Sequence, residues 1–148
     1  MVRVDFGESS FLFTGDMEEP AIESMVAFYD PSETLDADVY HVGHHGSYNG
    51  TTEGLMHAVT PDIAVISMGR WDDEKPWTAW AYGHPREHAV ELLESEITNR
   101  RSPRPVHVAS AVKQFYSTTM RDAIYGTGWD GNIQIRATAD GKQEVRTE

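Results

Sequence analysis

Apolar and polar residues recur with clear periods along the first 30 residues, and these periods predict two strands and a helix. Val2–Phe6 alternates apolar and polar residues, which predicts a strand. After a turn at Gly7–Ser10, Phe11–Phe13 predicts a second and more buried strand. Apolar residues at helical spacing predict a helix over Glu18–Tyr29, and Pro31 lies beyond its end.

Strands and helices continue to alternate through the middle of the chain. The predicted strands are Asp38–Val42 and Ile63–Met68, and the predicted helices are Thr52–Val59 and Pro85–Ile97. Between Ile63–Met68 and Pro85–Ile97 lies a long loop, Gly69–Gly83. Loops of this length are usually functional or disordered.

The last third of the chain is predicted from weaker signals. We expect a linker at Arg100–Pro105, a strand at Val106–Val108, a helix at Val112–Ala123, and a hairpin of Ala123–Gly126 with Asn132–Ala137 around Trp129-Asp130-Gly131. The alternation of strands and helices predicts an α/β fold or a layered αββα mixture. The 148 residues suit a single domain over residues 1–148, with one core.

Composition limits the chemistry and the partners. The chain has 24 acidic and 12 basic residues, a formal net charge of -12, which argues against a basic surface for nucleic acid. This charge does not exclude a nuclease, because bound metals supply local positive charge. With no cysteine, any metal must bind histidine and carboxylate, as zinc, manganese or iron can. No apolar run approaches the ~20 residues of a membrane span, so a soluble, cytoplasmic location is the default expectation.

Two candidate sites follow directly after predicted strands. Asp16 comes after Gly15, which permits a sharp turn, although Asp16 could equally be the N-cap of the following helix. His44 and His45 lie between two glycines, and neutral imidazole is the commonest protein ligand for a metal. His41 lies inside the strand and is interpreted as a packed residue.

A third candidate is His84, which precedes a proline and the start of a helix. The proline restricts His84 to an extended backbone, although a histidine in this place is often structural. His57, His88 and His107 fall in predicted helices or a strand, and we expect none of them to be a ligand. The long loop carries Trp71, Trp77 and Trp80, which either stack on a substrate or pack over the core.

Taken in order, these motifs resemble one family. The matching segments are Phe11–Asp16, Ala37–Val39 leading into His44–Ser47, Pro61–Ser67 and Gly83–Pro85, with Ala123–Thr127 and Asp130–Ile133 nearer the end. They are similar to the C-terminal half of metallo-β-lactamase-fold proteins. The greatest similarity is to the hydrolase domain of ComEC-type DNA-internalisation competence proteins and their soluble relatives.

The resemblance implies part of an αββα sandwich and a metal-dependent hydrolase. Metal-activated water would attack a phosphodiester or similar ester bond, in nucleic acid or a small phosphodiester. By position, Asp16 matches a carboxylate that touches or bridges the metals, His84 matches a late ligand, and His44 and His45 match the family's histidine pair. Asp16, His44 and His45 are therefore the expected catalytic residues, and zinc is expected before manganese or iron. A lactone or amide is the alternative substrate, because the fold hosts many chemistries.

One family motif has no counterpart in this chain. The early His-x-His/Asp-x-Asp-His run is absent, so we expect the N-terminal half of the sandwich to be missing. The sheet would then expose an apolar face, and the partner would be that missing half or a second copy of the chain. The rival hypothesis from another class is a non-catalytic fragment or interaction module with a vestigial metal site. The hydrolase hypothesis predicts that Asp16, His84 and one of His44 or His45 surround one point.

Overall fold

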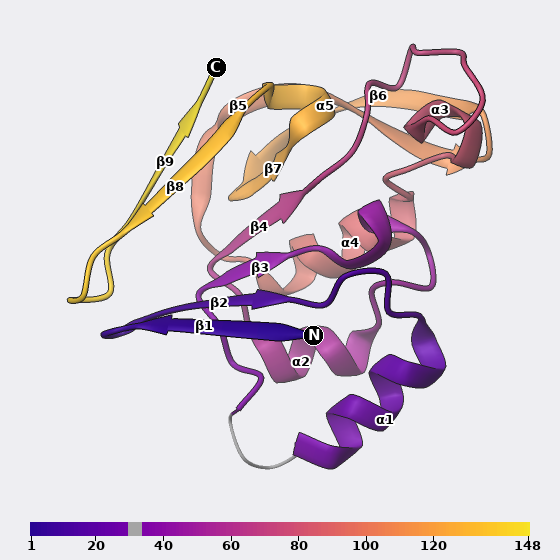
Figure 1. Ribbon diagram of the computed structural model, residues 1–148. Helices are drawn as coiled ribbons and strands as arrows, with labels where there is room; N and C mark the ends of the chain where they lie inside the picture. The colour runs from indigo at the N-terminus through magenta and orange to yellow at the C-terminus, as the bar shows by residue number, and fades with distance from the viewer. Residues whose placement is uncertain (30–33) are drawn as a thin grey trace.

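The computed structural model describes residues 1–29 and 34–148, so Pro31 lies outside the described residues. Its main sheet has five strands in the order β1-β2-β3-β4-β7 (Figure 1). These strands are β1 (Val2–Phe6), β2 (Ser9–Phe13), β3 (Val39–His41), β4 (Ile63–Ile66) and β7 (Ile124–Gly126). β1 is antiparallel to β2, and the other neighbours are parallel. The chain therefore has an α+β fold, which confirms the expected fold class.

Three helices cover one face of this sheet. They are α1 (Glu19–Tyr29), α2 (Glu53–Val59) and α4 (Glu87–Glu96), close to the predicted positions. Thr52 caps α2, since its hydroxyl accepts a hydrogen bond from the Leu55 N–H at 3.2 Å. The core lies between helices and sheet, where Leu12, Tyr40, Ala64 and Ile66 of the strands meet Ile22, Leu55, Val59 and Leu93 of the helices. This burial fixes the ends of the strands, where the candidate residues lie.

The opposite face of the sheet is partly covered and is open near β1 and β2. Phe11, Phe13, Val39, His41 and Val65 point to this side, and with Ile133 and Ile135 they line a hollow of about 280 Å³. Four apolar side chains near this edge remain 38–59% exposed, namely Val2, Val4, Phe6 and Phe13. A hairpin of β8 (Ile133–Ala137) and β9 (Gln143–Thr147) stands beside the sheet on the side away from α1 and α2 (Figure 1).

The predicted linker and late helix are wrong. Arg100–Ala111 is one strand, β5, and it pairs antiparallel with β6 (Gln114–Asp122), where the helix was expected. Aromatic and β-branched residues such as Phe115, Tyr116 and Thr118 favour a strand over a helix. The prolines of β5 are tolerated because a two-stranded ribbon leaves one side of each strand unpaired.

The predicted hairpin around Asp130-Gly131 is also wrong. Its first arm is β7, which pairs with β4 through Ala64 and Ile124, and its second arm is β8, which pairs with β9. The intervening residues form a short helix, α5 (Thr127–Asp130), that ends at Gly131 with φ of +77°. Gly131 does mark a change of chain direction, but it ends a helix and does not join two paired strands. No helix among the described residues is long and apolar enough to cross a membrane.

Candidate metal and active site

The loops after β2 and β3 meet at the carboxyl end of the sheet. The Thr14-Gly15-Asp16 loop touches the short 3-10 helix η1 (Gly43–Gly46), since the His44 N–H donates to the Gly15 carbonyl at 3.0 Å. A Cβ added at Gly43 would lie 2.7 Å from the Thr14 hydroxyl, so only glycine permits this approach. The two candidate motifs are thus joined through their backbones.

The Tyr40 side chain contacts both of these loops. Its hydroxyl accepts a hydrogen bond from the Gly43 N–H at 3.1 Å and lies 3.3 Å from the Thr14 hydroxyl. Tyr40 is fully buried, and burial raises the pKa of its phenol. A neutral, hydrogen-bonded phenol therefore fixes the distance between the loops after β2 and β3.

The backbone of η1 is strained where the histidines occur. His44 and His45 adopt φ values of 47° and 56°, in the left-handed region that residues other than glycine rarely occupy. Gly46 continues with φ of +74°. Strain of this kind clusters at functional sites, because only the surrounding structure can maintain it.

His84 lies close to η1, on the short segment between α3 (Ala79–Tyr82) and α4. Its N–H donates to the Ala79 carbonyl at 2.9 Å. The next two residues dock on η1, where the Arg86 N–H donates to the Gly46 carbonyl at 2.8 Å. A Cβ added at Gly46 would lie 2.8 Å from the Pro85 Cβ, so the two loops are in close contact.

This docking brings the His44 and His84 rings together. Their centres are 5.9 Å apart at an interplanar angle of 53°. The Nδ1 atoms of both rings are buried, and neither has a hydrogen-bond partner among the described residues. The Glu18 carboxylate approaches the His44 Nδ1 only to 3.9 Å. Burial, followed by the charges of His44, His45 and Arg86, lowers the pKa of His84 to about 4. His84 is therefore neutral near pH 7, with a lone pair available.

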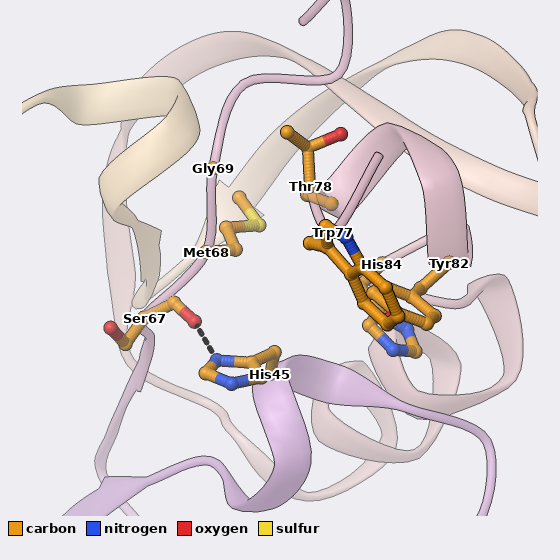
Figure 2. Close-up of a pocket in the computed structure, with 9 residues that line it drawn as sticks. His45, Ser67, Met68, Gly69, Trp77, Thr78, Tyr82 and His84 are labelled. Atoms are coloured by element: carbon orange, nitrogen blue, oxygen red, sulfur yellow. Dashed lines mark hydrogen bonds between the residues drawn. The ribbon is translucent and has the colours of Figure 1, made fainter. Parts of the chain in front are cut away.

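His45 differs from this pair. Its Nδ1 lies 2.6 Å from the Ser67 carbonyl oxygen and must carry the proton, so the neutral ring keeps its lone pair on Nε2. The ring is exposed and shares a cavity of about 420 Å³ with His84, Trp77 and Tyr82. Figure 2 shows His45 and the other three rings on different sides of this cavity.

Asp16 is exposed on the loop that touches η1. The helix α1 begins three residues later, at Glu19, so Asp16 is not its N-cap. Within residues 1–29 and 34–148, no group of three or more histidine, aspartate or glutamate side chains is arranged to hold a metal. The structure therefore brings His44 and His84 together, but the residues that it describes do not preform a site with three ligands.

The pair itself fits a divalent metal. Two imidazoles on one tetrahedral zinc, with bonds of about 2 Å, hold their ring centres about 5 Å apart. The observed separation of 5.9 Å is close to this value, and each ring has a buried nitrogen with no partner in the described part of the chain. Buried polar atoms are normally paired, so these two nitrogens are the candidates for binding a ligand.

The remaining histidines have other contacts. His41 stacks on Phe13 at 5.6 Å on the open face, and His107 stacks on Trp71 at 3.9 Å. The Nε2 of His57 lies 3.2 Å from a carboxylate oxygen of Glu96, and His88 is exposed on α4. That none of His57, His88 and His107 binds metal stays a prediction.

Sequence patterns assigned no role to Glu18, Tyr40 or Tyr82. Glu18 sits in the first candidate loop, and Tyr40 precedes the histidine motif, so both could have been noticed by position alone. Tyr82 stacks on His84 at 5.9 Å and 13°, two residues away from it in sequence. The spacing of two residues gave no signal, because it depends on the turn at Gly83.

Comparison with known proteins shows relatives among competence and recombination proteins. A stretch of 78 residues, 52% of the chain, is 45% identical to Recombination protein 2 of Haemophilus influenzae. Another of 98 residues, 66% of the chain, is 32% identical to Competence protein ComA of Neisseria gonorrhoeae. A third of 91 residues, 62% of the chain, is 30% identical to ComE operon protein 3 of Bacillus subtilis. These matches cover 9%, 14% and 10% of the respective relatives.

No protein-family model and no solved structure matches the chain at a significant level. The expected likeness to competence proteins is thus confirmed for part of the chain. The metallo-β-lactamase assignment and the metal-dependent reaction stay predictions.

Proposed function

We propose that this chain contributes to a metal-dependent hydrolase that cleaves a phosphodiester or similar ester bond. The observation that carries the proposal is the His44–His84 pair, whose buried Nδ1 atoms have no partners among the described residues and whose ring centres lie 5.9 Å apart. The names of the relatives refer to competence and recombination, and we place the activity in the same process.

His44 and His84 would hold the metal, and Asp16 would join them from the adjoining loop. A bound divalent metal supplies a water nucleophile near neutral pH and stabilises developing negative charge. The low pKa of His84 keeps its ring in the form that binds metal. The Ser67 carbonyl fixes the tautomer of His45, which suits that ring to hold a proton or to contact the substrate.

The remaining ligands and the cover of the open face would come from a partner. A catalytic zinc site needs about three protein ligands and one open position. The exposed apolar face of β1 and β2 lies on the same sheet and suits contact with the missing half of the sandwich or with a second copy. We therefore expect the chain on its own to turn over substrate slowly and to associate.

Metal retention tests the first part of this proposal. Zinc or manganese is added to the purified chain, the excess is removed, and the bound metal is measured by mass spectrometry. We expect retention by the wild-type chain, loss in His44→Ala and His84→Ala, and no change in the control His88→Ala. A wild-type chain that retains no metal, or retention that survives His84→Ala, would contradict the site.

Turnover and mass test the second part. Hydrolysis of bis(4-nitrophenyl) phosphate with added manganese or zinc is measured together with mass by light scattering. Slow turnover and a mass above that of one chain are expected. A stable monomer with rapid metal-dependent turnover would contradict the need for a partner.

A second candidate is a non-catalytic interaction module. It is favoured by the absence of a preformed group of three ligands among the described residues, together with the open apolar face. This candidate predicts association with no retained metal, so the same two measurements separate it from the hydrolase. A lactone or amide hydrolase of the same fold would retain metal but leave the phosphodiester intact.

A further inference from the structure

Trp77 stands on the loop between β4 and α3 with its side chain in solvent. The residue is 86% exposed, and its backbone adopts φ of +67°, which residues other than glycine rarely do. A single exposed aromatic residue would need no explanation. Trp77, however, lines the cavity that holds His45 and His84, so its position relates to the candidate site.

Aromatic rings form a continuous series from Trp77 to the histidine pair. The Trp77 and Tyr82 ring centres are 6.3 Å apart, and those of Tyr82 and His84 are 5.9 Å apart. His84 is in turn 5.9 Å from His44. Figure 2 shows Trp77, Tyr82 and His84 together on one side of the cavity. The Trp77 and Tyr82 rings are inclined by 47°, so a flat group stacked on Trp77 would meet Tyr82 at an angle and would lie beside the proposed reaction centre.

The cavity has the size and lining of a small-molecule site. Its volume of about 420 Å³ lies in the range of about 300–1,000 Å³ that such sites occupy. Met68, Trp77 and Tyr82 supply apolar and aromatic surface, and the two histidines supply polar groups. A second hollow of about 380 Å³, which Trp77 and Tyr82 also line, contains Lys113, whose Nζ lies 4.8 Å from the centre of the Trp80 ring.

We propose that Trp77 and Tyr82 form a platform that stacks an unpaired nucleobase of the substrate. The inference deepens the proposed function and rests on it for the identity of the reacting bond. Every base presents a flat π face, so such a platform accepts single strands of varied sequence. Bases inside a duplex are already stacked, so the platform would select single-stranded nucleic acid.

The charge of the chain supports stacking as the main source of affinity. With a formal net charge of -12, the surface attracts phosphates poorly, and binding through many phosphate contacts is disfavoured. Lys113 is one cation beside the platform, enough for about one phosphate. Affinity should therefore depend on the bases and only weakly on salt concentration.

Binding without metal tests the platform separately from catalysis. The probe is a fluorescent oligothymidine, measured by anisotropy in EDTA against an abasic oligomer of equal length and against a duplex. Oligouridine tests RNA as the source of the bases. We expect oligothymidine or oligouridine to bind about tenfold more tightly than the abasic oligomer, which has the same phosphates but no bases to stack.

Matched variants locate the effect. Trp77→Leu removes the ring and should weaken binding about tenfold, to the level of the abasic oligomer, whereas Trp77→Phe should retain most of it. Tyr82→Leu is a second, independent variant. Phe28→Ala, which alters an aromatic residue on α1 that is 79% exposed, should bind as the wild-type chain does.

The outcomes separate the two proposals. Equal binding of oligothymidine and abasic oligomer, absent binding of all probes, or full binding by Trp77→Leu would overturn the platform, whatever the chain hydrolyses. Base-dependent binding that is lost in Trp77→Leu and Tyr82→Leu supports the platform. That result would hold even if no metal is retained and the hydrolase proposal fails.

Discussion

Arg101 with Asp130 and His44 with His84 are two polar pairs near the strand ends, and only the first is joined by hydrogen bonds. The Nε of Arg101 is nevertheless buried without a partner among the described residues. The Asp130 side chain is 1% exposed, and its oxygens accept hydrogen bonds from Arg101 at 2.5 and 2.8 Å. The Gly126 N–H adds a third hydrogen bond at 3.0 Å. This ion pair joins the start of β5 to α5, far apart in sequence.

The histidine pair also has buried polar atoms, but no such hydrogen bonds join its two side chains. The Nδ1 atoms of His44 and His84 are buried without partners among the described residues, and Arg86 adds positive charge nearby. Folded proteins leave few buried polar atoms unpaired. The difference teaches that hydrogen bonds within the protein hold the first pair together, whereas the second pair has donor atoms left over, as the proposed metal site requires.

Breaking the Arg101–Asp130 ion pair should have the largest effect on stability. Asp130→Ala leaves the buried guanidinium of Arg101 without its partner, so the free energy of unfolding should fall by roughly 3–5 kcal/mol. Urea unfolding followed by circular dichroism measures this change. Asp140→Ala, which removes an exposed partner of Lys142, is the control and should unfold as the wild-type chain does. Equal stability of the Asp130→Ala and wild-type chains would show that the ion pair is dispensable.

Breaking the His44–His84 pair should affect metal affinity instead. His84→Ala should weaken zinc binding by at least about 100-fold, the upper end for loss of a supporting group around a metal. Isothermal titration calorimetry gives the affinity, with His57→Ala as a control on the exposed side of α2. A His84→Ala chain that binds zinc as the wild-type chain does would remove the difference between the two pairs.

The pH dependence of stability sharpens the comparison in the metal-free chain. The pKa of His84 is lowered from 6.5 to about 4, so the unfolded chain takes up a proton before the folded chain does. The stabilisation is complete above pH 6.5 and is lost as the pH falls towards 4. Full burial would make this loss about 3 kcal/mol, and partial exposure of the ring reduces the expectation to about 1–2 kcal/mol.

Urea unfolding of the wild-type and His84→Phe chains between pH 7 and pH 4, in EDTA, measures this loss. The phenylalanine variant should show a smaller decrease across the same range, because it has no proton to gain. Identical decreases in both chains would mean that other groups cause the effect.

The smallest effect should come from the outer part of the ion pair. Arg104 Nε lies 3.6 Å from an Asp130 oxygen, but the Arg104 side chain is 49% exposed. Exposed ion pairs contribute little, so Arg104→Ala should destabilise the chain by about 1 kcal/mol or less. The same urea experiment measures it, and a loss as large as that of Asp130→Ala would place Arg104 inside the buried pair.

Local patterns predicted the main sheet and its covering helices, but they failed for the pair of strands β5 and β6. Val2–Phe6 and Glu18–Tyr29 have unambiguous periods, and the strand and helix occur there. Val112, Phe115 and Met120 have a spacing that also fits a helix, but pairing with β5 makes this segment a strand. Such pairing depends on residues distant in sequence, so local patterns cannot settle it.

The sequence led us to expect Asp16, His84 and one of His44 or His45 around one point. The structure brings His44 and His84 together, with ring centres 5.9 Å apart, but the described residues hold no group of three such ligands. The glycines and the proline beside His44, His45 and His84 marked them as unusual. Their approach depends on Pro85 docking against Gly46, a contact between loops about 40 residues apart. The role of Trp77 could not be chosen from sequence, since exposed and packed tryptophans look alike there.

The contact between Gly46 and Pro85 also limits how the sequence can diverge. The two histidine loops can approach this closely only because Gly46 has no Cβ. Any side chain at position 46 would collide with Pro85 and would need a left-handed backbone. Gly54 is the opposite case, with open space where a Cβ would be. In a saturation library, position 54 should accept many residues. Position 46 should retain glycine wherever the library is selected for the histidine pair.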